Sequence, residues 1–262
     1  MYSRFLTAGD MPINSTVDIS GSSRFGNHVI RNIAAHCIAK QNNIKMTYSF
    51  YEDIRQLGID LFIGENTYEN TMDITDFNLM SIIKCESELQ LNLHIHENCY
   101  CQTPEFSEYL RTYLQSIQLS IIEKNPQKER YSINNDLFVH VRLGDLLDME
   151  RDQNKKCYHP FEYYDKVCSS IQFEKGYIAS DSLDHSICQR LIEKYKLIPV
   201  LKNEIDTIQF GSTCKHIVLS PGTFSYLIGV LGFFSTIYYS NDGIYKWHGD
   251  IFVFPDWNKV II

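Results

Sequence analysis

One short stretch of the chain has residue types and a position that suit the binding of a phosphate. It covers residues 140–145 (His-Val-Arg-Leu-Gly-Asp) and follows an apolar run, residues 137–141, that predicts a strand. In open α/β sheets ligands bind at the carboxyl ends of parallel strands, so Arg142 is well placed to meet a phosphate. A guanidinium donates two parallel hydrogen bonds and stays charged at physiological pH, which suits a diphosphate. The alternative is a surface turn in which Arg142 forms an ion pair with Asp145.

Two more polar loops follow predicted strands in the second half of the chain, after residues 176–180 and 216–220. The residues of these loops that could contact a ligand are Asp181, Ser182, Thr223, Phe224 and Ser225. Parallel strands bring such loops to one edge of the sheet, where a carboxylate and several hydroxyls would join the arginine. The second loop opens a predicted helix, whose N-terminal N–H groups favour an anion. The alternative is that these side chains only cap the helices that follow.

A glycine-bounded loop in the first half, residues 21–27 (Gly-Ser-Ser-Arg-Phe-Gly-Asn), lies between a predicted strand over 17–20 and a predicted helix. It contains neither the Gly-Lys-Ser/Thr of a P-loop nor Gly-x-Gly-x-x-Gly. Arg24 and the backbone N–H groups could still face an anion across a cleft. A tight turn without a ligand is the alternative.

The order of the elements predicts an α/β fold with two domains. After residue 130 strands and helices alternate, which predicts a parallel sheet with right-handed crossovers. An amphipathic helix is predicted over 104–124, and the polar, proline-containing stretch 125–130 is the predicted hinge. We therefore expect an N-terminal domain of residues 1–128 and a C-terminal domain of residues 129–262.

Composition excludes some classes of protein. The formal net charge is −8, and an acidic surface argues against nonspecific nucleic-acid binding. Residues 217–241 carry no charge, but prolines and glycines interrupt them, so a strand, a helix and a strand are predicted instead of a membrane span. The first ten residues lack the apolar stretch of a signal peptide, and the eight cysteines show no repeated spacing. We expect reduced thiols and a cytosolic protein.

Two histidines and two cysteines lie close together in the first half of the chain, where a metal site is an alternative. His94, His96, Cys99 and Cys101 alternate along a short segment and could hold zinc. Their spacing fits no standard structural zinc site, so the sequence does not predict a bound metal.

Four segments, taken in order over about residues 17–240, resemble the α-1,2-fucosyltransferase family (glycosyltransferase family 11). Residues 21–27 resemble its Gly-Gly-x-Gly-Asn-Gln loop and residues 140–145 its His-x-Arg-Arg-Gly-Asp motif. Residues 177–181 resemble its Ser-Asp-Asp strand end and residues 214–225 its Ser-x-Phe-Ser segment. The resemblance implies a GT-B-like fold of two Rossmann-like domains whose parallel sheets face a cleft. It also implies a GDP-fucose donor, inversion at the anomeric carbon, and no metal or other cofactor.

The resemblance also implies site residues. Arg142 would contact the β-phosphate of the donor. There it would stabilise the negative charge that develops on the leaving diphosphate. The other implied substrate-binding residues are Arg24, Gly26, Asn27, His28, His140, Asp181, Ser182, Thr223, Phe224 and Ser225. A carboxylate or histidine would deprotonate the acceptor, and Asp145, Asp148, Glu150 and His28 are the candidates. Three positions differ from the family: Leu143 replaces the second arginine, Ser182 the second aspartate and His28 the glutamine.

The function expected is transfer of a sugar, L-fucose from GDP-fucose, to a hydroxyl of a glycan or small sugar. Three alternatives stay open. One is a non-catalytic nucleotide- or sugar-binding protein of the same fold, another is a transferase with a different nucleotide sugar, and the third is an unrelated α/β nucleotide-binding enzyme.

Overall fold

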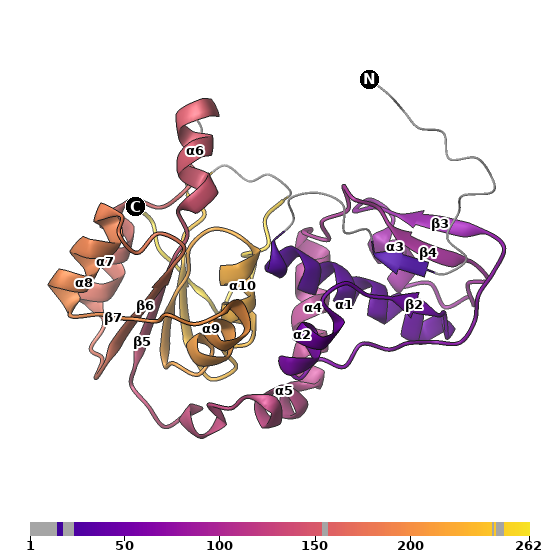
Figure 1. The fold of residues 1–262 in the computed structure, drawn as a ribbon, viewed down its shortest axis with the longest axis horizontal. Helices are drawn as coiled ribbons and strands as arrows, with labels where there is room; N and C mark the ends of the chain where they lie inside the picture. The colour runs from indigo at the N-terminus through magenta and orange to yellow at the C-terminus, as the bar shows by residue number, and fades with distance from the viewer. Residues whose placement is uncertain (1–14, 18–23, 154–156, 243, 245–248) are drawn as a thin grey trace. The chain divides into compact units, whose positions relative to one another are not determined.

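The computed structural model describes residues 15–17, 24–153, 157–242, 244 and 249–262 of the chain. The chain forms two compact units, which Figure 1 colours from indigo to yellow along the sequence. The first unit comprises the residues up to Arg55 and Asp60–Phe106, and the second comprises Gln56–Ile59 and Ser107–Ile262.

Helix α4 (Pro104–Ser116) explains why the units divide earlier than the boundary after residue 128 that the sequence suggested. From Ser107 onward its polar contacts lie within the second unit. The Ser107 Oγ lies 2.6 Å from the hydroxyl of Tyr226 and donates to the carbonyl of Ile251 at 2.9 Å. The polar hinge residues therefore lie inside the second unit.

The first unit contains a parallel sheet with strand order β2-β1-β4-β3. Its elements are β1 (Ser15–Val17), α1 (Phe25–Asn42), β2 (Met46–Thr47), α2 (Tyr51–Gln56), β3 (Thr71–Ile74), α3 (Leu79–Ile83) and β4 (Asn92–Ile95). The helix predicted after the loop 21–27 is confirmed as α1, on which Val29 and Ile33 are fully buried. The helix ends at Asn43, which adopts the left-handed conformation and donates its N–H to the Ala39 carbonyl.

The second unit contains a six-stranded parallel sheet. Its elements after α4 are α5 (Gln118–Lys124), η1 (Lys128–Arg130), β5 (Leu137–Val141), α6 (Gly144–Gln153), α7 (Phe161–Ser170), β6 (Gly176–Ser180), α8 (Ser186–Tyr195), β7 (Ile198–Pro199), α9 (Glu204–Gly211), β8 (His216–Val218), α10 (Thr223–Val230), β9 (Thr236–Tyr239) and β10 (Asn258–Lys259). One prediction was wrong in detail. The helix expected over 104–124 is interrupted at Ile117, whose ψ of 15° is not helical.

The strand order of this sheet identifies where a ligand would bind. The strands run β10-β9-β8-β5-β6-β7, and every neighbouring pair is parallel. Counted from β5, this is 3-2-1-4-5-6, the order of the Rossmann fold. In that order the first three strands are added towards one edge of the sheet, and the fourth returns to the other side of the first. Ligands bind at this switch point, beyond the carboxyl ends of the first and fourth strands. Here those strands are β5 and β8.

Strand β5 sends alternate side chains to the two faces of the sheet. The residues that enter the core cluster with α7 and α8 are Leu137, Val139 and Val141. On the other face the ring of Phe138 lies 6.3 Å from that of Phe210 on α9, and the ring of His140 lies 5.1 Å from that of Phe224 on α10. Figure 1 shows the same arrangement, with α7 and α8 on one face and α9 and α10 on the other.

The charge-free segment forms β8, α10 and β9, as predicted. Among the helices that the structure describes, none has both the length and the apolar content needed to cross a bilayer.

Candidate functional site

Arg142 lies immediately after β5, at the point where the sheet reverses its direction of growth. Its backbone N–H donates to the Oγ of Ser220, just beyond β8, at 2.8 Å, which joins the two strand ends. Its Nη2 lies 3.2 Å from a carboxylate oxygen of Asp145 in the first turn of α6. The buried Nε has no hydrogen-bond partner in the part of the chain that the structure describes. The ion pair expected as the alternative is therefore present, and it leaves guanidinium capacity for an anion.

Gly222 provides the space in which this guanidinium lies. The residue has φ of +104°, which side-chain-bearing residues rarely adopt, and it is the N-cap of α10. A Cβ at Gly222 would lie 2.2 Å from Nη1 of Arg142. The guanidinium therefore packs against the backbone that opens α10, where free N–H groups and the helix dipole also favour an anion.

Replacing Gly222 with alanine is expected to displace Arg142 and to strain the backbone. Alanine at this φ costs on the order of 1–3 kcal/mol, and the methyl group would occupy the position of Nη1. We expect a lower unfolding midpoint in urea for Gly222→Ala than for the wild type. An unchanged midpoint would contradict the positive φ of Gly222 and its close approach to Arg142.

His140 and Ser225 face each other inside the sheet–helix layer. Ser225 is fully buried, and its Oγ accepts the N–H of Ser220 at 2.9 Å and lies 2.5 Å from Nδ1 of His140. A serine hydroxyl that accepts from Ser220 can still either donate to Nδ1 or accept from it, so Nδ1 has a hydrogen-bond partner in a neutral ring of either tautomer. Burial lowers the pKa of His140 to about 4. The two residues thus support the loop that carries Ser220, and α10 begins without a side-chain cap from the residue before it.

The neutral His140 makes the stability of the protein depend on pH. The unfolded chain binds the imidazole proton near 6.5, but the folded chain binds it only near 4, because burial lowers the pKa. Above pH 6.5 the free energy of unfolding does not depend on this proton. As the pH falls from 6.5 towards 4, the unfolded chain binds the proton and the folded chain does not, which lowers the free energy of unfolding by about 3 kcal/mol in total. We expect His140→Gln to flatten the dependence of the unfolding free energy on pH in this window, as measured by urea denaturation. An unchanged slope would contradict a neutral buried ring.

Asp181 and Leu143 fix the loop after β5 from its other side. Oδ1 of Asp181 accepts the N–H of Leu143 at 2.8 Å. Asp181 is therefore not the cap of the following helix, whose N-cap is His185. The Leu143 side chain is fully buried in the core cluster with α7 and α8. The side chain that follows Arg142 therefore lies in the core and is not available to a ligand.

Ser182 and Thr223 complete the second-unit positions predicted from the sequence. The N–H of Ser182 donates to the Oγ of Ser180 at 3.0 Å, and its side chain is partly exposed. Thr223 is the first residue of α10 and is buried. Phe224 is partly exposed and covers the ring of His140.

The carboxylates considered as bases are engaged to different degrees. Asp145 is paired with Arg142 and stays 43% exposed. Asp148 lies 3.0 Å from Arg151 on the exposed side of α6, as expected for a solvated charged run. Glu150 hydrogen-bonds to Tyr158 and raises the pKa of that phenol to about 12. Asp145 is therefore the carboxylate of this helix that lies beside Arg142.

The first-unit candidates lie together at the start of α1. Arg24 is its exposed N-cap, and Gly26 is buried. Oδ1 of Asn27 accepts from the side chain of Gln102 at 3.1 Å. His28 is buried, and its Nδ1 lies 3.3 Å from the Oγ of Ser49. Residues 21–23 of the predicted loop lie outside the described residues.

Sequence reasoning missed the contributions of Ser220 and Gly222. Both belong to a Ser-Pro-Gly sequence, and a glycine just before a helix at a strand end was the available signal. What the sequence could not indicate is that Gly222 contacts Arg142, which is 80 residues away along the chain by the numbering.

Comparison of the chain with protein-family models, with curated proteins and with solved structures gives no significant match. Fold and site geometry therefore define the class: an α/β protein with two parallel sheets, the second in the Rossmann order. Its arginine lies at the strand ends where ligands bind in that fold.

Proposed function

We propose that the chain is an inverting, metal-independent glycosyltransferase that moves a sugar from a nucleoside diphosphate to a hydroxyl. The donor we propose is GDP-fucose, and the acceptor is a glycan or small sugar. The observation that carries the proposal is the position of Arg142, packed on Gly222 between the ends of β5 and β8. The ordered resemblance to the fucosyltransferase family adds the identity of the donor, and with it a GT-B arrangement of the two units.

The proposed chemistry requires support for a leaving diphosphate. When an acceptor hydroxyl attacks the anomeric carbon, negative charge develops on the β-phosphate. The Arg142 guanidinium and the first N–H groups of α10 would stabilise this charge, and losing one such donor typically costs about 2.7–4 kcal/mol of barrier. Thr223 would contribute to the same anion site, and Asp181 would hold the loop through Leu143.

Removal of the acceptor proton is assigned to Asp145 within this proposal. Its carboxylate is partly exposed and lies beside the arginine that would hold the diphosphate. A carboxylate can accept the proton of an attacking hydroxyl.

One observation favours a second candidate, a non-catalytic nucleotide- or sugar-binding protein. Both carboxylates closest to the strand ends already have partners, since Asp145 pairs with Arg142 and Asp181 accepts from Leu143. A protein of this kind would bind the nucleotide through the same arginine without needing a base.

A donor panel separates these candidates. Thermal-shift measurements with GDP, UDP, ADP and dTDP should show the largest stabilisation with GDP, and the corresponding sugars should be transferred or hydrolysed only with GDP-fucose. Binding of GDP without transfer or hydrolysis over many acceptors would favour the binding protein. Stabilisation by another nucleotide would replace the donor, and no response to any nucleoside diphosphate would overturn the proposal.

The proposal includes a cytosolic setting. All eight cysteines lie in the described part of the chain and none forms a disulfide bond, which fits a reducing compartment.

A further inference from the structure

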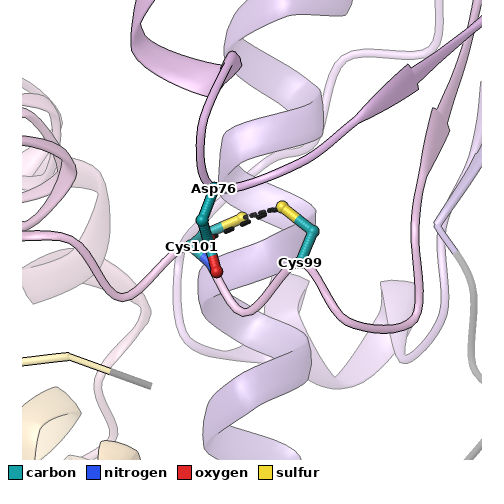
Figure 2. Close-up of side chains that lie close together, drawn as sticks. All are labelled: Asp76, Cys99 and Cys101. Carbon is teal, nitrogen blue, oxygen red and sulfur yellow. Dashed lines mark hydrogen bonds between the residues drawn. The ribbon is translucent and has the colours of Figure 1, made fainter.

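A second cluster of reactive side chains lies in the first unit, at the carboxyl ends of β3 and β4. These strands pair in parallel and end together, with Ile74 opposite Ile95. Asp76 follows the first strand, and Cys99 and Cys101 follow the second. Figure 2 shows the three side chains converging from these two loops. Both cysteines are 1% exposed, so the cluster is almost closed to solvent.

We propose that Asp76, Cys99 and Cys101 bind one zinc ion, with a water molecule as the fourth ligand. Thiolate and carboxylate ligands suit zinc, which takes tetrahedral sites with sulfur, nitrogen or oxygen donors. Binding replaces water ligands of the aqueous ion with two Zn–S bonds and one Zn–O bond to Asp76, keeps one Zn–O bond to water, and releases the two thiol protons to solvent.

Two of the three distances between the ligand atoms match the edges of a zinc tetrahedron, and the third is no longer than 4.8 Å. With Zn–S of 2.3 Å and Zn–O of 2.1 Å, two sulfurs should lie about 3.8 Å apart, and a sulfur and an oxygen about 3.6 Å apart. The two Sγ atoms lie 3.6 Å apart, and Sγ of Cys99 lies 3.6 Å from Oδ1 of Asp76. The three ligand atoms all lie within 4.8 Å of one another.

The backbone fixes this arrangement without the ion. Asp76 accepts the N–H of Cys101 at 2.6 Å and that of Tyr100 at 3.3 Å, and each carboxylate oxygen keeps a further lone pair. Cys101 has φ of +54°, a left-handed conformation that is unusual for a cysteine. That conformation lets two cysteines separated by one residue turn towards the same point.

Arg31 of α1 supplies the charge that balances such a site. It is fully buried and donates to the carbonyls of Ile95 and His96 at 3.3 and 3.0 Å. Its Nε and Nη1 have no hydrogen-bond partner within the described residues. Its guanidinium is close enough to Cys101 for the two groups to interact electrostatically. Zinc with two thiolates and one carboxylate carries one negative charge, which this guanidinium neutralises, and a buried charge needs such a partner.

The histidines considered with these cysteines have other roles. His94 lies 2.8 Å from Asp73, and Nδ1 of His96 accepts the N–H of Asn98 at 3.1 Å. Asp76 replaces them in the cluster.

Cobalt titration of the reduced, chelator-treated full chain tests the proposal, because cobalt reports the number of thiolate ligands. We expect one equivalent, an ultraviolet thiolate-to-cobalt band, the strong visible bands of tetrahedral cobalt, and displacement by one equivalent of zinc. Cys99→Ser and Cys101→Ser should remove the ultraviolet band, and Asp76→Asn should weaken zinc binding more than the 10–100-fold typical of losing an outer-shell partner. Cys85→Ser, in the same unit, should behave as the wild type.

The unfolding midpoint provides a second measurement that does not depend on the colour of cobalt. Zinc should raise it in the wild type and in Cys85→Ser but not in the three ligand variants, because an ion that binds only the folded state stabilises it. Circular dichroism of each variant without metal checks that it is folded. Reduced wild type that takes up neither metal would overturn the proposal, and so would isolation of a Cys99–Cys101 disulfide that reduction does not convert to a metal-binding form.

Discussion

Leu143→Arg, which would introduce a second arginine beside Arg142, is expected to unfold the second unit. The Leu143 side chain is fully buried in the hydrophobic cluster of the sheet with α7 and α8. A charge buried without a partner costs on the order of 3–5 kcal/mol, a large part of the 5–15 kcal/mol that stabilises a typical domain. Urea denaturation followed by circular dichroism measures the loss.

Leu143→Met is the matched control for this variant. It keeps an apolar side chain of similar volume, so it should cost less than about 1.5 kcal/mol. If Leu143→Arg unfolded at the same urea concentration as Leu143→Met, the side chain would have to reach solvent, and the buried orientation would be contradicted.

Under the proposed function, Arg142→Ala is expected to lower the rate of sugar transfer by about 10²–10³, because the variant would lack a donor to the charge that develops on the leaving diphosphate. Arg142→Lys should recover part of the rate, since an ammonium keeps the charge but not the planar fork. Steady-state kinetics with the donor that the nucleotide panel identifies would measure both.

Arg151→Ala is the control for this loss of rate. Arg151 is an exposed cation on α6, 70% accessible, whose partners are Asp148 and Asp152. It should leave the rate unchanged. A rate for Arg142→Ala within twofold of that for Arg151→Ala would remove Arg142 from the reaction.

Much of the second unit could be predicted from its pattern of residues. The strands over 137–141 and 176–180 are confirmed at both ends, since their apolar runs are bounded by polar or glycine residues. Helix α9 has a start signal of the same local kind, since Asn203 caps it by accepting the N–H of Asp206. Local signals of this kind need no knowledge of distant contacts.

Other features depend on contacts that periodicity does not encode. The apolar stripe over 104–124 continues through Ile117, but the helix breaks there. The boundary after residue 128 rested on a polar stretch, yet Asn125 within that stretch is buried and donates to the carbonyl of Gln209. A polar residue can join two parts of a unit as well as separate them.

The candidate site illustrates the same limit. Position after a parallel strand correctly placed Arg142 and Asp181 at the edge of the sheet, because strand polarity alone determines that edge. His140 and Leu143 are buried because helices cover the faces of the sheet on which their side chains lie. Sequence spacing gives the alternation of faces but not which helix covers each one.

Calorimetric titration of GDP, GMP and guanosine into the wild type and Arg142→Ala tests the central claim most directly. Under the proposed function, the wild type should bind GDP more tightly than GMP, and GMP more tightly than guanosine. Arg142→Ala should lower the affinity for GDP to that for GMP and leave the affinity for guanosine unchanged. A variant that still prefers GDP over GMP by the wild-type ratio would contradict the claim that Arg142 anchors a diphosphate.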